Sequence, residues 1–474
     1  MTDVFFKNSV YFQTSFLLPN STTVAELQSA VNALLEKRFR VFLSLVDVEH
    51  GTLKENTVSK TIPVEELSAV TIGEIHDEVC RDSRTRMEVA CRLFLAVDGD
   101  SCHYLIVHAH HGVADGTLIT AFVRCLYAVM NHNPLPDMPD FEFFDPTKRP
   151  ELLEFPDSVD SSDEDSVQKW CEDCAQTISP ATVYPEMAPG SHLRYFTKER
   201  IISKEVTKRA VTFAKSCGDL YKENGCIHGM LLRAYLRAIV FADHLPQSGI
   251  IGIDTIVNMR RYLKAKSGLS LGFSSIDDTQ PSIFFSSFPS VFSVEKLLQG
   301  ELNPARIQHT VTEGLNQGLP LALLFLDPSR AHPSIKKNQL VLEMSNLGIH
   351  PKDCFPRRLV SQVAYDGRPN TITVVVWTDL TGCFHLCCSA FSGYVEEDRL
   401  DRFMDEFAHQ LFDCGVVSHV CSTRHFTFLL AQPDSMSKES VRLAVAIFIV
   451  RTSPFRMSGS FAFRWMTTMK RTRA

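Results

Sequence analysis

The segment from Arg92 to Asn131 constrains the fold of this chain more than any other. Two strand-like runs, Arg92–Val97 and His103–Ala109, flank Asp98-Gly99-Asp100. Asp-Gly between two such runs predicts a β-hairpin, because that dipeptide adopts the backbone angles of a tight turn. Apolar residues then recur at helical spacing over Gly116–Asn131, so a helix is predicted there.

The strand and the helix are joined by His110-His111-Gly112-Val113-Ala114-Asp115-Gly116. Asp115 stands at the expected N-cap of the helix, which is its first structural role. A histidine at a strand end beside a glycine suits a general base in a cleft, because imidazole titrates near neutral pH. Gly116 permits a tight entry into the helix, and Gly112 leaves room for a substrate beside the base.

Strand and helix patterns alternate along both halves of the chain, which predicts a mixed-sheet α/β protein with two domains. A capping box, Thr23 with Glu26, opens a helix over 23–36, and Phe39–Val48 is predicted as a strand. The other predicted strands are Arg194–Ile202, Ile250–Val257, Gln339–Met344, Leu359–Tyr365, Thr371–Thr378 and Cys383–Ala390. One further helix is predicted to start after Ser203, and two more are predicted over Ile227–Phe241 and Glu396–Phe412.

The HHxxxDG spacing of residues 110–116 resembles the signature of the CoA-dependent acyltransferase superfamily, which includes condensation domains, alcohol acetyltransferases and chloramphenicol acetyltransferase. The resemblance implies that His111 is the general base. It also implies that Asp115 points away from the substrate and pairs with an arginine, for which Arg260 is the candidate and Arg261 the alternative. His110 is expected to be a buried structural residue at the end of its strand.

Three further segments resemble the alcohol-acetyltransferase and polyketide-associated acyltransferase branch. They are residues 253–260, which end in Asn-Met-Arg, the helix over 225–239 with His228-Gly229, and Met344-Ser345-Asn346-Leu347-Gly348. Ser345 and Asn346 are candidate donors to the oxyanion. The resemblance implies two chloramphenicol-acetyltransferase-like domains, at 1–180 and 190–420, with an active-site tunnel between them.

The resulting hypothesis is a CoA-dependent acyltransferase that acts on an alcohol or amine, with acyl-CoA as a co-substrate and no bound cofactor or metal. A free-standing condensation-type enzyme that uses a carrier-protein donor is one alternative, and a non-catalytic binding protein on the same fold is another. A metal site at His108, His110 and His111 is disfavoured, because Gly112 stands where the HxHxDH pattern needs an aspartate.

Composition narrows the class of protein. A net charge of −7 argues against nucleic-acid binding, and 474 residues exceed a usual single core. Residues 434–474 carry eight Lys or Arg and two acids, so the 421–474 segment is a basic tail, expected to be disordered or outside the fold.

The cysteines have no regular spacing, which favours reduced, buried cysteines over a disulfide scaffold. Cys171-x-x-Cys174 lacks the second pair of ligands that a zinc site needs. With no signal peptide or transmembrane segment expected, the sequence predicts a monomeric cytoplasmic enzyme.

Overall fold

The structure is a computed structural model. It describes residues 11–47, 52–54, 59–68, 74, 89–97, 99, 101–136, 140–177, 195–221, 226–242, 249–264, 279–326, 341–349, 356–360, 371–379, 381–391 and 395–413. The predicted interdomain connection near Pro180–Gly190 and the predicted basic tail after Cys421 lie outside the described residues. The chain divides into two compact units after His419, and all of the described residues belong to the first unit.

A five-stranded mixed sheet forms the N-terminal half, in the order β13-β1-β6-β5-β4. Its strands are β1 (Tyr11–Leu18), β4 (Val64–Ser68), β5 (Cys91–Val97), β6 (His103–His110) and β13 (Pro356–Val360). The antiparallel pair β5 and β6 confirms the predicted hairpin. Strand β13 comes from far downstream, within the C-terminal half of the chain, and completes this first sheet by pairing with β1.

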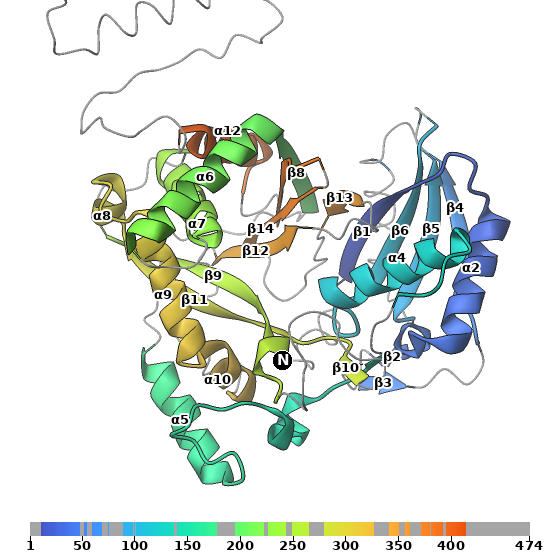
Figure 1. Cartoon of the computed structure of the whole chain (residues 1–474), viewed down its shortest axis with the longest axis horizontal. Coiled ribbons are helices and arrows are strands. Elements are labelled where there is room, and N and C mark those ends of the chain that lie inside the picture. Colours follow the sequence, from blue (N-terminus) through green and yellow to red (C-terminus); the bar gives the residue numbers. More distant parts are fainter. Residues whose placement is uncertain are drawn as a thin grey trace, which may run out of the picture. The chain divides into compact units, whose positions relative to one another are not determined.

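Helices α2 (Val24–Lys37) and α4 (Gly116–Met130) pack against each other and against this sheet (Figure 1). The capping box at Thr23 is present, because its hydroxyl accepts from the backbone of Glu26 while the Glu26 carboxylate accepts from the backbone of Thr23. The apolar residues Leu105 and Val107 of β6 belong to the core under these helices. Both predicted helices are therefore confirmed.

The prediction of a strand over Phe39–Val48 was wrong. Residues Arg40–Leu43 form a 3-10 helix, and only Leu45–Asp47 (β2) is a strand. Phe39 turns the chain at a φ of 60°, in the left-handed region that a strand excludes. Its fully buried ring stacks against Phe141 and meets the edge of Phe122, with centroid distances of 5.8 and 5.5 Å. Aromatic packing thus overrides the local β preference of an apolar run.

A second, six-stranded mixed sheet forms the C-terminal half, in the order β11-β9-β12-β14-β15-β8. Its strands are β8 (Tyr195–Ile202), β9 (Ile250–Asn258), β11 (Phe285–Ser293), β12 (Val341–Ile349), β14 (Thr371–Thr378) and β15 (Phe384–Phe391). Strand β12 is parallel to both of its neighbours, and the remaining pairs are antiparallel. Two mixed sheets with helices confirm the predicted α/β class.

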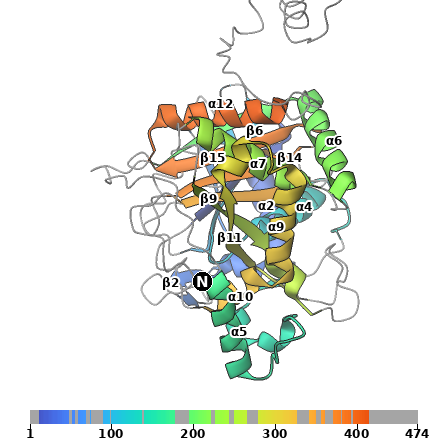
Figure 2. The same ribbon diagram turned by 90° about the vertical axis from the view of Figure 1, so that its left-hand side faces the viewer.

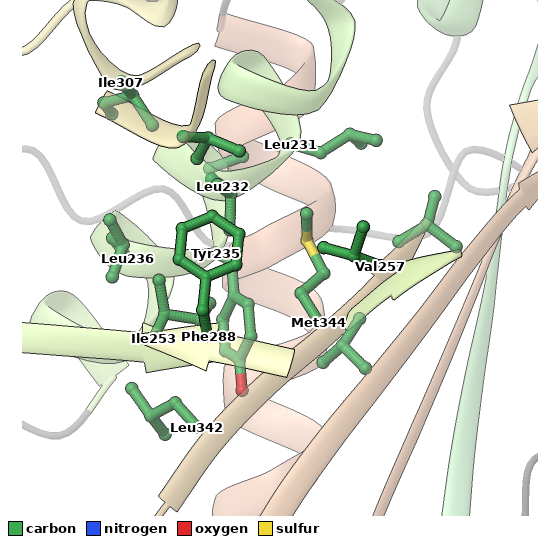
Figure 3. Packing of buried hydrophobic residues seen from close by; sticks show 14 of the residues in the cluster. Leu231, Leu232, Tyr235, Leu236, Ile253, Val257, Phe288, Ile307, Leu342 and Met344 are labelled. Carbon is green, nitrogen blue, oxygen red and sulfur yellow. The ribbon is translucent and has the colours of Figure 1, made fainter. Parts of the chain in front are cut away.

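One face of the second sheet is covered by helices (Figure 2). They are α6 (Lys204–Tyr221), α7 (Ile227–Ala242), α9 (Pro304–Asn316) and α12 (Glu397–Asp413). Figure 3 shows α7 at the centre of this core, where Tyr235 lies among residues of the sheet that include Ile253, Phe288 and Met344. The Tyr235 hydroxyl donates to the carbonyl of Ile372 at 3.1 Å, so the buried phenol has a partner.

The remaining elements are mostly shorter. They are β3 (Thr52–Lys54), β7 (Asp140–Glu142), η2 (Pro146–Lys148), η3 (Pro150–Leu152), α5 (Glu164–Thr177), η4 (Met259–Tyr262), β10 (Thr279–Pro281), α8 (Val294–Leu298) and α10 (Leu319–Phe325). Helix α5 begins at Glu164, at the end of an acidic stretch that includes Asp157, Asp160 and Asp163. Strand β13 covers Pro356–Val360 and so overlaps the start of the predicted strand Leu359–Tyr365, of which residues 361–365 lie outside the described residues. No helix in the described parts of the chain combines the length and apolarity needed to cross a membrane.

Helix α7 approaches α9 so closely at Gly229 that a side chain has no space. A Cβ there would lie 2.2 Å from the carbonyl oxygen of Pro304 and 2.8 Å from the amide nitrogen of Gln308. Gly229 also donates its amide hydrogen to the Gln308 side chain at 3.0 Å. The glycine of the predicted His-Gly pair is therefore a packing residue between two helices.

Gly229→Ala should consequently lower the free energy of unfolding by about 1–3 kcal/mol, the usual cost of overpacking a core. The matched control is Gly116→Ala, because a Cβ at Gly116 would meet only Leu347, at 3.8 Å, which is an ordinary contact. Thermal melts of the two variants and the parent protein measure the difference. Equal melting temperatures for both variants would contradict the packing role of Gly229.

Candidate active site

His111 lies just beyond the end of β6, in the turn that leads into α4. Its Nδ1 is 2.9 Å from the carbonyl oxygen of Ala114. Because a carbonyl oxygen can only accept, Nδ1 must carry the hydrogen, and Nε2 is the basic nitrogen of the neutral ring. Burial lowers the pKa of His111, against the opposing effects of the Ala114 hydrogen bond and the Asp115 charge. The imidazole is therefore neutral at cellular pH.

His110 has a different environment from its neighbour. It is fully buried as the last residue of β6, and its Nδ1 accepts a hydrogen bond from the amide of Gly112 at 3.1 Å. Burial and the adjacent His111 lower the pKa of His110 to about 3. His110 therefore stays neutral over the physiological range and shapes the turn that presents His111.

Asp115 uses both carboxylate oxygens. Oδ1 accepts from the amides of Thr117 and Leu118, at 3.0 and 3.1 Å, and so caps α4. Oδ2 accepts from Arg260 Nη1 at 2.7 Å and from the amide of Phe284 at 3.0 Å. Asp115 is 5% exposed, and its carboxylate accepts from backbone amides and from the Arg260 guanidinium. In this geometry Asp115 organises the loop.

Arg260 lies in η4, directly after β9, and reaches across to α4. Besides its ion pair with Asp115, it donates from Nη1 to the Asn258 side chain at 3.3 Å and from Nη2 to the carbonyl of Pro281. Its side chain is 9% exposed. Arg261, the alternative partner, instead places its guanidinium over the ring of Tyr262 at 5.5 Å. The structure thus pairs Asp115 with Arg260.

Residues of the second sheet also contact the motif. The ring of Phe285, the first residue of β11, stacks on the His111 imidazole with a centroid distance of 4.6 Å and an interplanar angle of 22°. Asn258 donates to the Thr117 hydroxyl at 3.4 Å. Leu347 lies beside Gly116, whose backbone does not need a positive φ. The HHxxxDG segment is therefore held from both halves of the chain.

Ser345 and Asn346, the predicted oxyanion donors, project from opposite faces of β12. Met344 belongs to the core under the helices, so strand alternation places Asn346 toward that same side. The Asn346 Oδ1 accepts from the amide of Gly348 at 3.0 Å. Ser345 is on the other face, in register with Ile256 of β9, which follows the same face as Phe285. The structure separates the two candidates, and only Ser345 shares a face with Phe285.

Polar side chains continue along this face of the second sheet. One cross-strand row, in register from β9 to β8, contains Asp254, Glu343, Thr373, Ser389 and Thr197. Thr373 donates to Glu343 at 3.0 Å, and the hydroxyls of Thr197 and Ser389 are 3.2 Å apart. Sequence reasoning missed this row, because its members are single polar residues on five separate strands.

The alternative chemistry of a metal centre has no geometric support in the described residues, where no cluster of three or more His, Cys, Asp or Glu side chains could hold a metal ion. His108 lies in the middle of β6, in register with Gln13 and Arg92 rather than beside acidic residues. Cys171 and Cys174 are buried on α5 as part of the second core.

Phe284 and Phe285 are site residues that sequence reasoning missed. No strand was predicted over 285–293, because FSSFPSVFS has apolar and polar residues on both of its alternate faces. Pro289 in the middle of this run argues against a central strand, and β11 is in fact the edge strand of its sheet. The three phenylalanines and the valine, which are residue types that favour strands, were the available signal.

The fold defined by these two sheets, with a histidine motif where they meet, is that of the condensation domains and related acetyltransferases. By sequence, the chain matches no protein-family model and no curated protein. Solved structures show the similarity instead, at identities low enough that they establish the fold alone. The fold that the resemblance implied is confirmed by these structures.

Three of these structures illustrate the range. The trichothecene 15-O-acetyltransferase TRI3 from Fusarium sporotrichioides has a TM-score of 0.60 at 14% identity, over 87% of this chain and 93% of that one. SgcC5 from Streptomyces globisporus has a TM-score of 0.59 at 15% identity, over 86% and 93%. The first condensation domain of the CDA synthetase has a TM-score of 0.59 at 11% identity, over 87% and 92%.

The Asp115–Arg260 pair should contribute strongly to stability. Asp115→Ala leaves a buried guanidinium without its partner, so the free energy of unfolding should fall by about 3–5 kcal/mol. Arg260→Ala should have a similar effect, and the double variant should be less than additive, because both single changes remove the same interaction. Denaturant unfolding of the four proteins gives the coupling energy.

Asp115→Asn is the informative control, because an asparagine can still cap α4 while the charge is removed. Its unfolding free energy should lie between those of the parent and Asp115→Ala. Strict additivity in the cycle with Arg260→Ala would show that the two side chains contribute independently, contrary to this interpretation.

Proposed function

We propose that this protein is an acyltransferase that moves an acyl group from a CoA thioester to an alcohol or amine, with His111 as the general base. The observation that carries the proposal is the 2.9 Å contact between His111 Nδ1 and the Ala114 carbonyl. It makes Nε2 the proton-accepting nitrogen, and burial keeps the ring neutral and ready to accept.

The proposed reaction begins when an acceptor hydroxyl or amine attacks the thioester carbonyl carbon and gives its proton to His111 Nε2. The new bond leaves a negative charge on the carbonyl oxygen, which a donor such as Ser345 stabilises. The intermediate then collapses as the carbon–sulfur bond breaks. The departing thiolate takes the proton back from the His111 imidazolium, so the base is regenerated and free CoA is released.

The polar side chains on this face of the second sheet are suited to a substrate that has several hydrogen-bonding groups. Ser287 and Ser345 follow Phe285 along this face, and the Asp254–Thr197 row comes next. Hydroxyl and carboxylate side chains match the amides of a pantetheine arm or the hydroxyls of an acceptor. An acceptor or thioester arm extended along this face would keep its reacting atom near His111.

The donor separates this proposal from its nearest alternative. The same fold is found in an O-acetyltransferase and in condensation and epimerization domains of peptide synthetases, so the fold does not decide the donor. Purified protein should be incubated with an acyl-CoA panel and with the same acyl groups on a carrier protein, together with a metabolite extract. New acylated products detected by mass spectrometry with the CoA donors support the proposal. Products with the carrier donors alone favour a condensation-type enzyme, and none with either favours a binding protein.

His111→Ala should reduce turnover by about 10²–10⁴-fold, the usual contribution of a general base. The melting temperature should stay close to that of the parent, because His111 belongs to neither of the two main hydrophobic cores. His309→Ala is the matched control, since His309 is half-exposed on α9. Parental turnover in His111→Ala at saturating substrates would exclude the proposed base.

The value of kcat/KM should follow the fraction of His111 that is in the neutral form as the pH changes. Burial places its pKa below the usual value of about 6.5, so kcat/KM should stay level as the pH falls to 6.5 and decline only below it. A midpoint above 6.5 would contradict this assignment. Circular dichroism should accompany each point, because His110, with a pKa of about 3, makes the folded state lose stability as the pH falls below about 6.5.

A further inference from the structure

An aromatic ring from the second sheet covers one face of the His111 imidazole. The two rings are nearly parallel, with centroids 4.6 Å apart and planes inclined by 22°. Phe285 supplies this ring from β11, while His111 follows β6 of the first sheet. The contact therefore joins the candidate base to a residue that is distant in sequence and belongs to another sheet.

Phe285 points away from the core of its own half. Along β11, Ser286, Phe288, Ser290 and Phe292 are buried, whereas Phe285 and every second residue after it are only partly buried. Phe288 packs in the core under the helices, so strand alternation directs Phe285 to the opposite face. Core packing of the second sheet thus does not account for an aromatic residue at position 285.

The backbone beside Phe285 is fixed by the same carboxylate that organises the motif. Phe284 donates its amide hydrogen to Asp115 Oδ2 at 3.0 Å, and its buried ring meets Phe144 edge-on at 5.2 Å. Asp115 is four residues from His111, and Phe284 is adjacent to Phe285. One carboxylate therefore sets the position of both stacked rings through short stretches of chain.

Two contacts then define the orientation of the imidazole. The Ala114 carbonyl holds Nδ1 at 2.9 Å but allows the ring plane to rotate about that hydrogen bond. A flat ring stacked on the imidazole restricts this rotation, because parallel rings lose contact when one of them tilts. The direction of Nε2, and therefore the line along which it accepts a proton, is fixed by the two contacts together.

We propose that Phe285 is a positioning residue, which holds the His111 ring in the plane that aims Nε2 at the acceptor. This inference rests on the proposed function, in which His111 is the general base. His110, Asp115 and Arg260 are the titratable and charged groups of the surrounding motif, and the Asp115 charge raises the proton affinity of the imidazole, whereas Phe285 sets its direction. The residue acts through His111.

The test compares Phe285→Leu, Phe285→Tyr and the surface control Phe241→Leu in acyl-transfer assays with an acyl-CoA donor. Leucine fills much of the volume without a flat face, so kcat should fall by about 10–100-fold, in keeping with the sensitivity of proton transfer to small misplacements. Tyrosine keeps the flat ring and should restore kcat to near the parental value. KM for the acyl-CoA should change little in both variants.

A second comparison separates orientation from general damage. In a His111→Ala background, Phe285→Leu should have no further effect on the residual rate, because there is no ring left to orient. Phe285→Ala, which admits water to the imidazole, should also shift the acid limb of the pH profile toward the usual histidine value. In Phe285→Leu, the midpoint of the acid limb of the pH profile should be the same as in the parent protein.

The outcomes distinguish this inference from the function on which it rests. Parental kcat in Phe285→Leu, equal losses with leucine and tyrosine, a change confined to KM, or a further loss in the His111→Ala background would each overturn the positioning role. The proposed acyltransferase function would survive all four results. A parent protein without transfer activity from either donor class would overturn both.

Discussion

The carboxylate of Asp115 is the interaction on which the candidate site depends. It caps α4, pairs with Arg260 and accepts the amide hydrogen of Phe284, so one side chain joins a helix start, a 3-10 turn and the beginning of β11. A buried charge of this kind requires compensation from every side, and the structure provides four donors. Because those donors come from both halves, the geometry around His111 belongs to neither half alone. The carboxylate of Asp115 thus joins the elements on both sides of the turn that carries His111.

The similarity to solved structures fits this division of roles. Structures with this fold include an epimerization domain, condensation domains and an O-acetyltransferase, so the two-sheet arrangement does not commit a chain to one reaction. Differences in chemistry must then arise from side chains rather than from the arrangement of the sheets. In this chain the face of the second sheet that carries Phe285 also carries Ser345 and the row from Asp254 to Thr197. These polar and aromatic residues lie on the face opposite to the core under the helices.

Sequence reasoning predicted the elements whose signal is local. The capping box at Thr23, the Asp-Gly hairpin and the helix after Asp115 all follow from neighbouring residues, and the structure has each of them. It failed where distant residues decide the conformation: Phe39 leaves the strand region because Phe122 and Phe141 bury its ring. The site divides in the same way. The resemblance indicated His111, Asp115 and Arg260, but Phe285 acquires its place only when β11 pairs with β9, and Ser345 and Asn346 separate only when strand alternation assigns their faces.

The pairing of β13 with β1 has a consequence for the order in which the protein is assembled during synthesis. Residues 13–16 remain at an open sheet edge until residues 356–360 have left the ribosome, although β1, β5 and β6 are complete long before. An open edge of paired strands is a template for unwanted association, and closure by distant residues is slow. The nascent N-terminal half therefore stays incomplete until most of the second half has been translated. Chaperone binding to β1 during that interval would protect the chain at the point where it is most exposed to aggregation.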